Sequence, residues 1–211
     1  KDTNDVLNLM EYSQKNSVPL LARGGGSSQC GQTVGESVVL DYSKHQNKIL
    51  ELNVEEKYVW VQPGVVLDHL NDYLKPHGLW FPVDVSTSSR ATIGGMSANN
   101  SCGSRSLYYG NMVHNVLAIE AILDDGSIFN FDQINKNYLA TKNNQDRLYK
   151  IIDKFIDVRQ KVGSEIDANW PTTQRRVGGY NIDLIDPEGF NSSNLLVGSE
   201  GTLSLFNKIK L

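Results

Sequence analysis

The spacing of apolar residues along the chain predicts three helices. The first covers residues 3–16, can be capped by Thr3 or Asp5, and turns three apolar residues toward the core, Val6, Leu9 and Met10. The second covers residues 66–74 and ends before a proline and a glycine. The third covers residues 147–162 and has the clearest apolar stripe, formed by Leu148, Ile151, Ile152, Phe155 and Val162.

Short runs of apolar and β-branched residues predict strands between these helices. The expected strands cover residues 20–22, 38–41, 49–52, 58–62, 79–81, 116–123, 127–131, 195–197 and 203–211. Two pairs form hairpins, one across a polar turn after residue 52 and one across Asp124-Asp125-Gly126, where Gly126 supplies a positive φ. Because helices alternate with strands and hairpins are also present, we expect an α+β protein with a mixed or antiparallel sheet.

The composition is that of a globular protein. Hydrophobic residues make up 39% of the 211 residues and charged residues 21%, and the formal net charge is −4, which gives no indication of a nucleic-acid partner. No apolar run approaches the roughly 20 residues that cross a bilayer. Cys30 and Cys102 are expected to be free thiols in a reducing cytosol. We therefore expect a cytoplasmic protein, at most peripheral to the inner membrane face, and a fragment of a longer polypeptide.

Three runs of small and polar residues stand apart from the predicted elements, at 23–28, 91–110 and 198–203. The first, Arg23-Gly24-Gly25-Gly26-Ser27-Ser28, directly follows a predicted strand, where glycine leaves backbone N–H groups open to a pyrophosphate. An ordinary glycine-rich surface turn is the alternative. The run is neither a P-loop nor the Gly-x-Gly-x-x-Gly fingerprint of dinucleotide-binding folds.

The second run has the same character. Thr92-Ile93-Gly94-Gly95 can start a short helix whose free amides face a phosphate or a flavin ring. Asn99 and Asn100 carry amides that donate to and accept from ring heteroatoms. A tight packing corner that requires small residues is the alternative.

These motifs, in their order along the chain, resemble the FAD-binding domain of the FAD-linked oxidase family. The resemblance is carried by residues 23–28, Gln62-Pro63-Gly64-Val65, 82–89, 92–110 and 198–203. The family shares its flavin fold with vanillyl-alcohol oxidase and includes D-lactate, glycolate and D-2-hydroxyglutarate dehydrogenases. Residues 99–106 and 175–181 most resemble large bacterial members that carry a C-terminal iron–sulfur region.

The resemblance implies a two-lobed domain over residues 1–211 with FAD between the lobes. Lobe one, about 1–83, would hold a small parallel sheet, and lobe two, about 84–211, a mixed or antiparallel sheet with helices. The residues that it implies for cofactor binding are Arg23, Gly24, Gly25, Gly26, Ser27, Ser28, Pro82, Ser88, Thr92, Ile93, Gly94, Gly95, Asn99, Asn100, Gly103, Ser104, Tyr109, Gly110, Glu200, Gly201 and Leu205.

The chain also departs from its relatives. Some relatives attach flavin through a histidine where this chain has Ser27, so we expect non-covalent FAD. Ser204 stands where many relatives have glycine. His114 is a candidate for catalysis, although a structural or exposed histidine is the more common case, and we name no catalytic residue and no metal site.

A second basic loop suggests a substrate site. Arg175, Arg176 and Tyr180 can bind a substrate carboxylate, since a guanidinium pairs with a carboxylate through two hydrogen bonds. A salt-bridged surface loop is the alternative.

The resemblance implies a dehydrogenase that oxidises a small 2-hydroxy acid by hydride transfer to flavin. Its substrate domain and iron–sulfur region would lie in other parts of the same chain, so this fragment is expected to be inactive alone. The alternatives are a flavin-binding or electron-transfer module without dehydrogenase activity, and a sugar-nucleotide reductase that shares the flavin fold.

Overall fold

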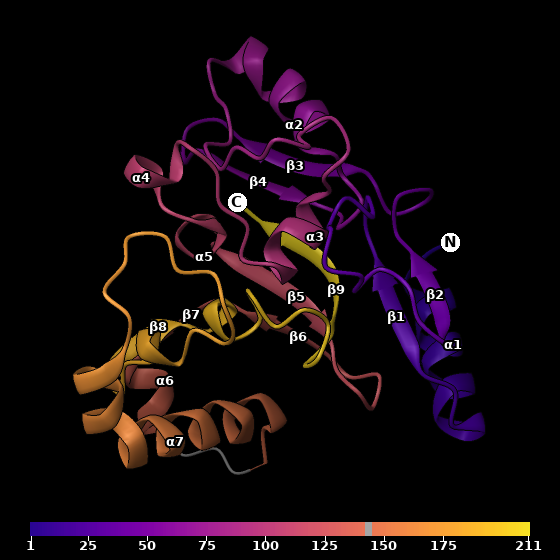
Figure 1. Cartoon of the computed structure of the whole chain (residues 1–211). Coiled ribbons are helices and arrows are strands. Elements are labelled where there is room, and N and C mark those ends of the chain that lie inside the picture. Colours follow the sequence, from indigo (N-terminus) through magenta and orange to yellow (C-terminus); the bar gives the residue numbers. More distant parts are fainter. Residues whose placement is uncertain (142–144) are drawn as a thin grey trace.

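A five-stranded antiparallel sheet lies at the centre of the computed structural model, which describes residues 1–141 and 145–211 (Figure 1). Its strands, in spatial order, are β3 (Ile49–Asn53), β4 (Tyr58–Val61), β9 (Leu205–Lys210), β5 (Ala118–Ile122) and β6 (Ile128–Phe131). Both predicted hairpins are confirmed, as β3–β4 and β5–β6. Gly126 has a φ of 82°, as the second turn requires.

Strand β9 joins the two hairpins. Val61 of β4 and Ile119 of β5 both pair with Ile209 of β9, and both pairings are antiparallel. The sheet therefore draws its strands from both sides of residue 83. The division of the chain into two lobes near that residue stays a prediction.

Two small sheets flank the central one. Strands β1 (Leu20–Arg23) and β2 (Val38–Asp41) pair in parallel, and β7 (Gln133–Asn135) and β8 (Gly189–Asn191) pair antiparallel. A small parallel sheet beside a larger antiparallel one with helices is the α+β class that the sequence predicts, so the fold class is confirmed.

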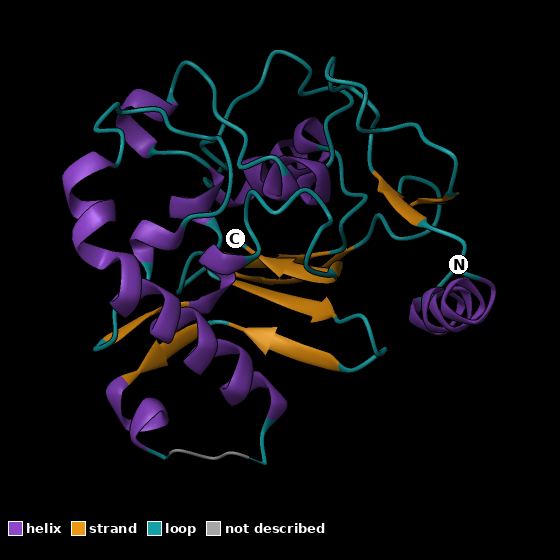
Figure 2. Cartoon of the chain, turned by 60° about the horizontal axis from the view of Figure 1, so that its bottom comes forward, coloured by secondary structure: helices purple, strands orange, loops and turns teal. Residues whose placement is uncertain are grey.

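Helices lie around these sheets. They are α1 (Thr3–Asn16), α2 (Leu67–Leu74), α3 (Ile93–Ala98), α4 (Ser106–Tyr109), α5 (Met112–Asn115), α6 (Lys136–Ala140) and α7 (Arg147–Asn169), with short 3-10 turns η1 (Lys75–His77), η2 (Ile182–Leu184) and η3 (Ser192–Leu195). Figure 2 shows α1 and α7 at opposite ends, with the central sheet between them. The three predicted helices are confirmed, but α7 runs seven residues past residue 162 and buries Ile166.

The cap of the first helix differs from the prediction. The carboxylate of Asp2, not Thr3 or Asp5, accepts the hydrogen bond from the Asp5 amide at 3.1 Å. Within the same helix Leu7, rather than Leu9, packs with Val6 against the core. The helix has the expected period and buries Val6 and Met10 as expected, but its apolar face includes Leu7 in place of Leu9.

The main core lies between the central sheet and helices α2 and α3. Its fully buried side chains include Val61, Ile119, Ile209, Leu70 and Ile93. Burying an aliphatic side chain of this size stabilises the fold by about 1.5–3 kcal/mol. This packing fixes α3 against the sheet, and so fixes the segment that carries the second glycine run.

Two predicted strands are wrong. At residues 79–81 the Phe81 amide donates to the Asn71 side chain at 2.7 Å, and so takes no part in a strand ladder. At residues 195–197 the chain leaves η3 in a turn, although Leu195 and Val197 are buried. A short apolar run indicates that its residues are buried, but it does not distinguish a strand from a buried helical turn.

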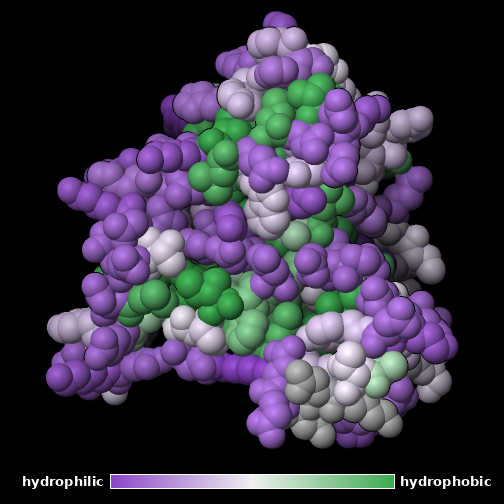
Figure 3. Space-filling model, turned by 180° about the vertical axis from the view of Figure 1, so that it is seen from behind, coloured by the Kyte–Doolittle hydropathy of each residue, from purple (hydrophilic) through white to green (hydrophobic). Residues whose placement is uncertain are grey.

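The surface keeps apolar side chains in several places. Leu50, Leu117 and Ile128 are exposed, and Figure 3 shows that apolar patches reach the face seen from behind. Within the described ranges, none of the helices has the length and apolar character to cross a bilayer.

Candidate functional site

A cavity of about 370 Å³ lies where the loop after β1 meets α3 and the turn before β9. Figure 1 shows α3 close to the loop that leaves β1. Many of the predicted cofactor residues line this cavity: Arg23, Gly24, Gly25, Gly26, Ser27, Ser28, Thr92, Gly94, Gly95, Asn99, Glu200, Gly201 and Leu205. All three runs of small and polar residues thus contribute to the lining of one cavity.

The loop of residues 24–28 lines the cavity, and its backbone amides are unpaired within the described chain. No N–H group of these five residues donates a hydrogen bond to another residue of the described chain. The Arg23 guanidinium lies against Gly26, since a Cβ at Gly26 would come within 2.7 Å of its Nη2 atom. Free amides beside a cation form a site suited to an anion.

Glycine is required in this loop for packing as well as for access. A Cβ at Gly24 would lie 2.1 Å from the Thr92 hydroxyl, and one at Gly25 would lie 2.1 Å from the Arg90 carbonyl oxygen. Both distances are far below van der Waals contact. The absence of side chains therefore lets the first run pack directly against residues 90–92.

The start of α3 is confirmed as a helix, but its amides are not free as expected. Ile93 donates to the Val65 carbonyl and Gly94 to the Pro63 carbonyl, both at 2.8 Å. The Thr92 hydroxyl accepts from the Gly95 amide at 3.4 Å. These bonds dock α3 on residues 63–65, so the helix start has a structural role. Thr92, Gly94 and the exposed Gly95 also line the cavity.

The other predicted cofactor residues lie outside the cavity lining, namely Pro82, Ser88, Ile93, Asn100, Gly103, Ser104, Tyr109 and Gly110. Gly103 and Ser104 pack on Asp84. A Cβ at Gly103 would lie 1.7 Å from the Asp84 carbonyl oxygen, and the Ser104 hydroxyl donates to the Asp84 carboxylate at 2.7 Å. Tyr109 packs edge-on against Trp80, with ring centres 5.2 Å apart.

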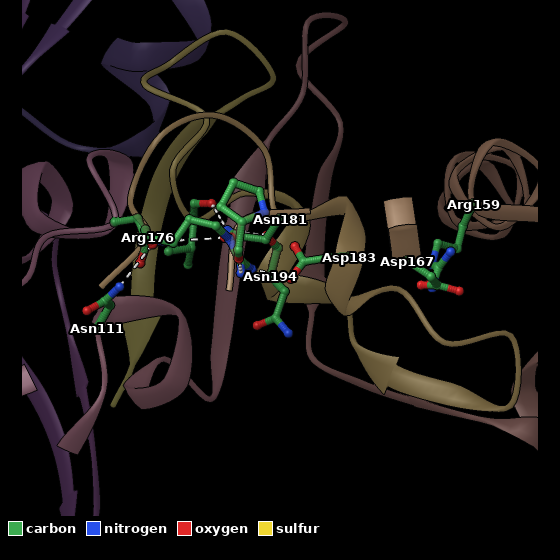
Figure 4. Close-up of polar contacts among 10 residues, drawn as sticks. Asn111, Arg159, Asp167, Arg176, Asn181, Asp183 and Asn194 are labelled. Carbon is green, nitrogen blue, oxygen red and sulfur yellow. Dashed lines mark hydrogen bonds and ion pairs between the residues drawn. The ribbon is translucent and has the colours of Figure 1, made fainter. Parts of the chain in front are cut away.

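Asn100 is part of a buried hydrogen-bond network. It adopts a φ of 50°, and its side-chain oxygen accepts from the Val113 amide at 3.0 Å. Its amide group donates to Asn181 at 3.3 Å, and Asn181 in turn donates to the carbonyls of Asn194 and Val197 at 3.2 and 2.7 Å (Figure 4). Asn181, which sequence reasoning did not single out, thereby ties the basic loop to α3 and to the turn before β9.

The basic loop lies at the edge of the site. Arg176 pairs with Asp183 and donates to the Pro171 carbonyl at 3.2 Å, while Asn111 donates to the Arg176 carbonyl at 3.0 Å (Figure 4). Arg175 remains exposed, with one bond to a backbone carbonyl. Arg176 is therefore salt-bridged, as in the alternative of a structural surface loop. The charged side chain of Arg175 is exposed to solvent.

Tyr180 contacts the cavity wall. Its hydroxyl forms a 2.8 Å hydrogen bond with the hydroxyl of Thr202, and Thr202 lines the cavity. The basic loop and the cofactor cavity are therefore joined through side chains.

His114 contacts the backbone at the start of α5, and both cysteines are unpaired. His114 is exposed, and its Nδ1 atom accepts a hydrogen bond from the Asn111 amide at 3.0 Å, which caps α5. Cys30 and Cys102 are free thiols. In residues 1–141 and 145–211, no group of three or more histidine, cysteine or acidic side chains is placed to hold a metal ion.

The predicted cofactor residues do not include Gln32, Tyr42, Pro63, Thr202 and Ser204, which also line the cavity. Pro63 and Thr202 lie within the runs that carry the resemblance, and Ser204 directly follows one of them. A signal for Tyr42 was present, since it directly follows β2, the parallel neighbour of β1. The carboxyl ends of parallel strands share one edge of a sheet, where ligands of α/β proteins commonly bind.

Comparison with curated proteins shows related sequences of much greater length. The chain is 36% identical to a D-2-hydroxyglutarate dehydrogenase of Haemophilus influenzae over 98% of its length, which is 20% of that protein. It is 34% identical to the Escherichia coli enzyme of that name, over 98% of this chain and 21% of the enzyme. A D-lactate dehydrogenase of Archaeoglobus fulgidus is 30% identical over 98% of this chain and 36% of its own.

Comparison with solved structures supports the same fold. An alkyldihydroxyacetonephosphate synthase superimposes with a TM-score of 0.62 over 99% of this chain and 32% of its own, at 19% identity. Residues 1–132, more than half of the chain, match the family described as an FAD binding domain. The chain therefore belongs to this family of FAD-binding domains.

Proposed function

We propose that the cavity holds FAD without a covalent bond, and that the amides of residues 24–28 bind its pyrophosphate. The observation that carries this proposal is the set of five successive amides, unpaired within the described chain, that line a cavity beside the Arg23 guanidinium. Backbone amides in such a loop match the charge and geometry of a pyrophosphate. Asn99, Glu200, Gly201 and Leu205 also line the cavity and would contact the rest of the cofactor.

The predicted cofactor residues outside the lining act differently in this proposal. Asn100, Gly103 and Ser104 hold the walls of the site through the contacts to Val113, Asn181 and Asp84. Only the residues that line the cavity are proposed to contact the cofactor directly.

Two measurements test this proposal. The full-length protein should carry one FAD that is released on denaturation, and the denatured polypeptide should have its unmodified mass. A polypeptide heavier by a flavin would contradict non-covalent binding. A protein that neither carries FAD nor takes it up when the cofactor is added would contradict the proposal as a whole.

We propose further that the protein to which this chain belongs oxidises a 2-hydroxy acid of the D-2-hydroxyglutarate, D-lactate or glycolate type. The relatives named as dehydrogenases support this function. Bound flavin would supply the hydride acceptor. This chain would hold and orient the cofactor, while the substrate domain, the catalytic base and an iron–sulfur region would come from the remaining length.

The exposed loop of residues 175–180 is proposed to bind the substrate carboxylate. Arg175 has an exposed guanidinium, and Tyr180 reaches the cavity wall through Thr202. Arg176 would support this loop through Asp183.

Anaerobic bleaching of the flavin absorbance tests the proposed activity. D-2-hydroxyglutarate, D-lactate and glycolate should be added separately to the full-length protein, with the L-enantiomers of the first two as controls. Bleaching by one of the named acids is expected. A protein that binds FAD but is bleached by none of them would act as a flavin-binding or electron-transfer module instead.

A further inference from the structure

Three residues that line the cavity each have a buried side-chain polar atom without a hydrogen-bond partner in the described part of the chain. The side chain of Tyr42 is only 7% exposed, and its hydroxyl has no partner in the described part of the chain. Ser204 is 8% exposed, and its hydroxyl also has no hydrogen-bond partner among the residues that the structure describes. A third polar atom, Oε1 of Gln32, is also buried and unpaired, and all three residues line the cavity.

An unpaired buried hydroxyl is energetically unfavourable. Leaving such a group without a partner costs about 1–3 kcal/mol. Some buried hydroxyls outside the cavity avoid this cost, as the Ser192 hydroxyl does by donating to the Asp132 carbonyl at 2.8 Å, whereas the Ser97 hydroxyl does not. A ligand that enters the cavity can supply the partners that the protein does not.

The two hydroxyls belong to elements that flank the glycine loop. Tyr42 directly follows β2, and its amide donates to the Arg23 carbonyl at 3.0 Å, which holds it beside the loop. Ser204 directly precedes β9, next to Leu205 and Phe206, which also line the cavity. The positions are therefore fixed by a parallel strand pair and by the central sheet.

The chemistry of both groups suits a nucleotide. Burial raises the pKa of the Tyr42 hydroxyl, so the group stays protonated and remains a donor. A serine hydroxyl donates one hydrogen bond and accepts others. Both can therefore pair with the ring nitrogens, carbonyl oxygens or sugar hydroxyls of a dinucleotide.

We propose that Tyr42 and Ser204 bind the cofactor directly, through hydrogen bonds from their hydroxyls to polar atoms of FAD beyond its pyrophosphate. This inference rests on the proposed binding of FAD in the cavity and adds two side-chain contacts to it. In this proposal the two hydroxyls destabilise the FAD-free protein, because they are buried without partners, and stabilise the complex with FAD.

The test compares FAD affinity with the stability of the FAD-free protein. The variants are Tyr42→Phe and Ser204→Ala, made in the full-length protein, each of which removes a hydroxyl and little else. The matched control is Ser97→Ala, because Ser97 is fully buried with an unpaired hydroxyl but does not line the cavity. FAD affinity is measured by titration of FAD-free protein followed by flavin fluorescence, and stability by the thermal midpoint without FAD.

We expect the dissociation constant for FAD to rise about tenfold in Tyr42→Phe and in Ser204→Ala, since one hydrogen bond contributes about 1.4 kcal/mol here. It should stay unchanged in Ser97→Ala. The midpoint without FAD should be unchanged or higher in all three variants.

Two outcomes would overturn the inference while leaving the proposed function intact. One is wild-type FAD affinity in both variants. The other is a thermal midpoint without FAD that falls by several degrees, which would make the hydroxyls structural. Failure of the wild-type protein itself to bind FAD would instead refute the proposed function, and this inference with it.

Discussion

The hydroxyl of Ser104 donates a 2.7 Å hydrogen bond to the carboxylate of Asp84, and the adjacent Arg105 amide donates to the same carboxylate at 3.0 Å. Partial burial is the largest single effect and acts to raise the pKa of Asp84, but these two hydrogen bonds, a backbone bond of Asp84 itself and the charge of Arg105 together hold the pKa below its ordinary value. The folded pKa thus lies below the unfolded one. The carboxylate therefore stabilises the fold above the unfolded pKa, and this stability is lost as the pH falls through the folded pKa.

Replacing Asp84 should consequently have a pH-dependent effect. Asp84→Asn should lower the free energy of unfolding by about 1 kcal/mol at pH 7, because two charge-assisted hydrogen bonds become neutral ones. The deficit should shrink as the pH falls below 3.8, the ordinary value for the carboxyl group. Denaturant unfolding at a series of pH values measures it. Asp153→Asn, at an exposed position of α7, is the control. A deficit that is equal at every pH would contradict this role.

The buried Asn181 network should dominate the stability of the region around the basic loop. Asn181→Ala removes hydrogen bonds to Asn194 and Val197 and leaves the Asn100 amide without its acceptor. We expect a loss of about 3 kcal/mol in the free energy of unfolding, since buried polar groups lose their partners. Asn4→Ala, on the exposed face of α1, should change stability by less than about 0.5 kcal/mol. Equal effects of the two changes would show that the network contributes little.

The glycine loop should not tolerate even a methyl group at Gly25. Its Cβ would lie 2.1 Å from a backbone oxygen, so Gly25→Ala should lower the free energy of unfolding by about 2 kcal/mol. It should also reduce the FAD that copurifies with the full-length protein, because the loop is displaced. Gly178→Ala is the control, since its Cβ would meet no described atom within 4 Å. Both quantities, measured by denaturant unfolding and by absorbance at the flavin band, should be normal there. Normal FAD content in Gly25→Ala would contradict the assigned geometry.

Replacing Arg175 should affect substrate binding, whereas replacing Arg176 should affect the stability of the fold. In the full-length protein, Arg175→Ala should raise KM for the 2-hydroxy acid about tenfold or more with little change in stability, because its guanidinium is exposed.

Arg176→Ala should instead lower the free energy of unfolding by about 2 kcal/mol, because it leaves Asp183 without its ion-pair partner. Steady-state kinetics and denaturant unfolding of both variants measure the two effects. An unchanged KM in Arg175→Ala would remove this residue from the substrate site.

Local features of the fold could be predicted from the sequence, and distant partnerships could not. The turn at Gly126 and the spacing of apolar residues in α7 are encoded within short segments, so both elements are confirmed. The position of β9 depends on pairing across more than 80 residues with β5 and across still more with β4. No local pattern reports such a pairing.

The same distinction applies to the site. The glycine loop could be recognised because exposed amides need small residues nearby in sequence, whereas its contact with Thr92 joins segments almost 70 residues apart and is seen only in the structure. The position of Tyr42 after β2 indicates that it lies at the ligand-binding edge of the parallel pair, but its residue type does not reveal the unpaired hydroxyl, which only the structure shows. The amides of Ile93 and Gly94 were misjudged because their acceptors lie some 30 residues away, at Val65 and Pro63.

The place of β9 between β4 and β5 has a consequence for biosynthesis. A ribosome delivers β4 and β5 long before the strand that must lie between them, so each hairpin waits with one edge open. Pairings of such high sequence separation form slowly, and open strand edges invite pairing with other chains. The nascent polypeptide therefore leaves the β4 and β5 edges open to pairing with other chains until residues 205–210 have emerged.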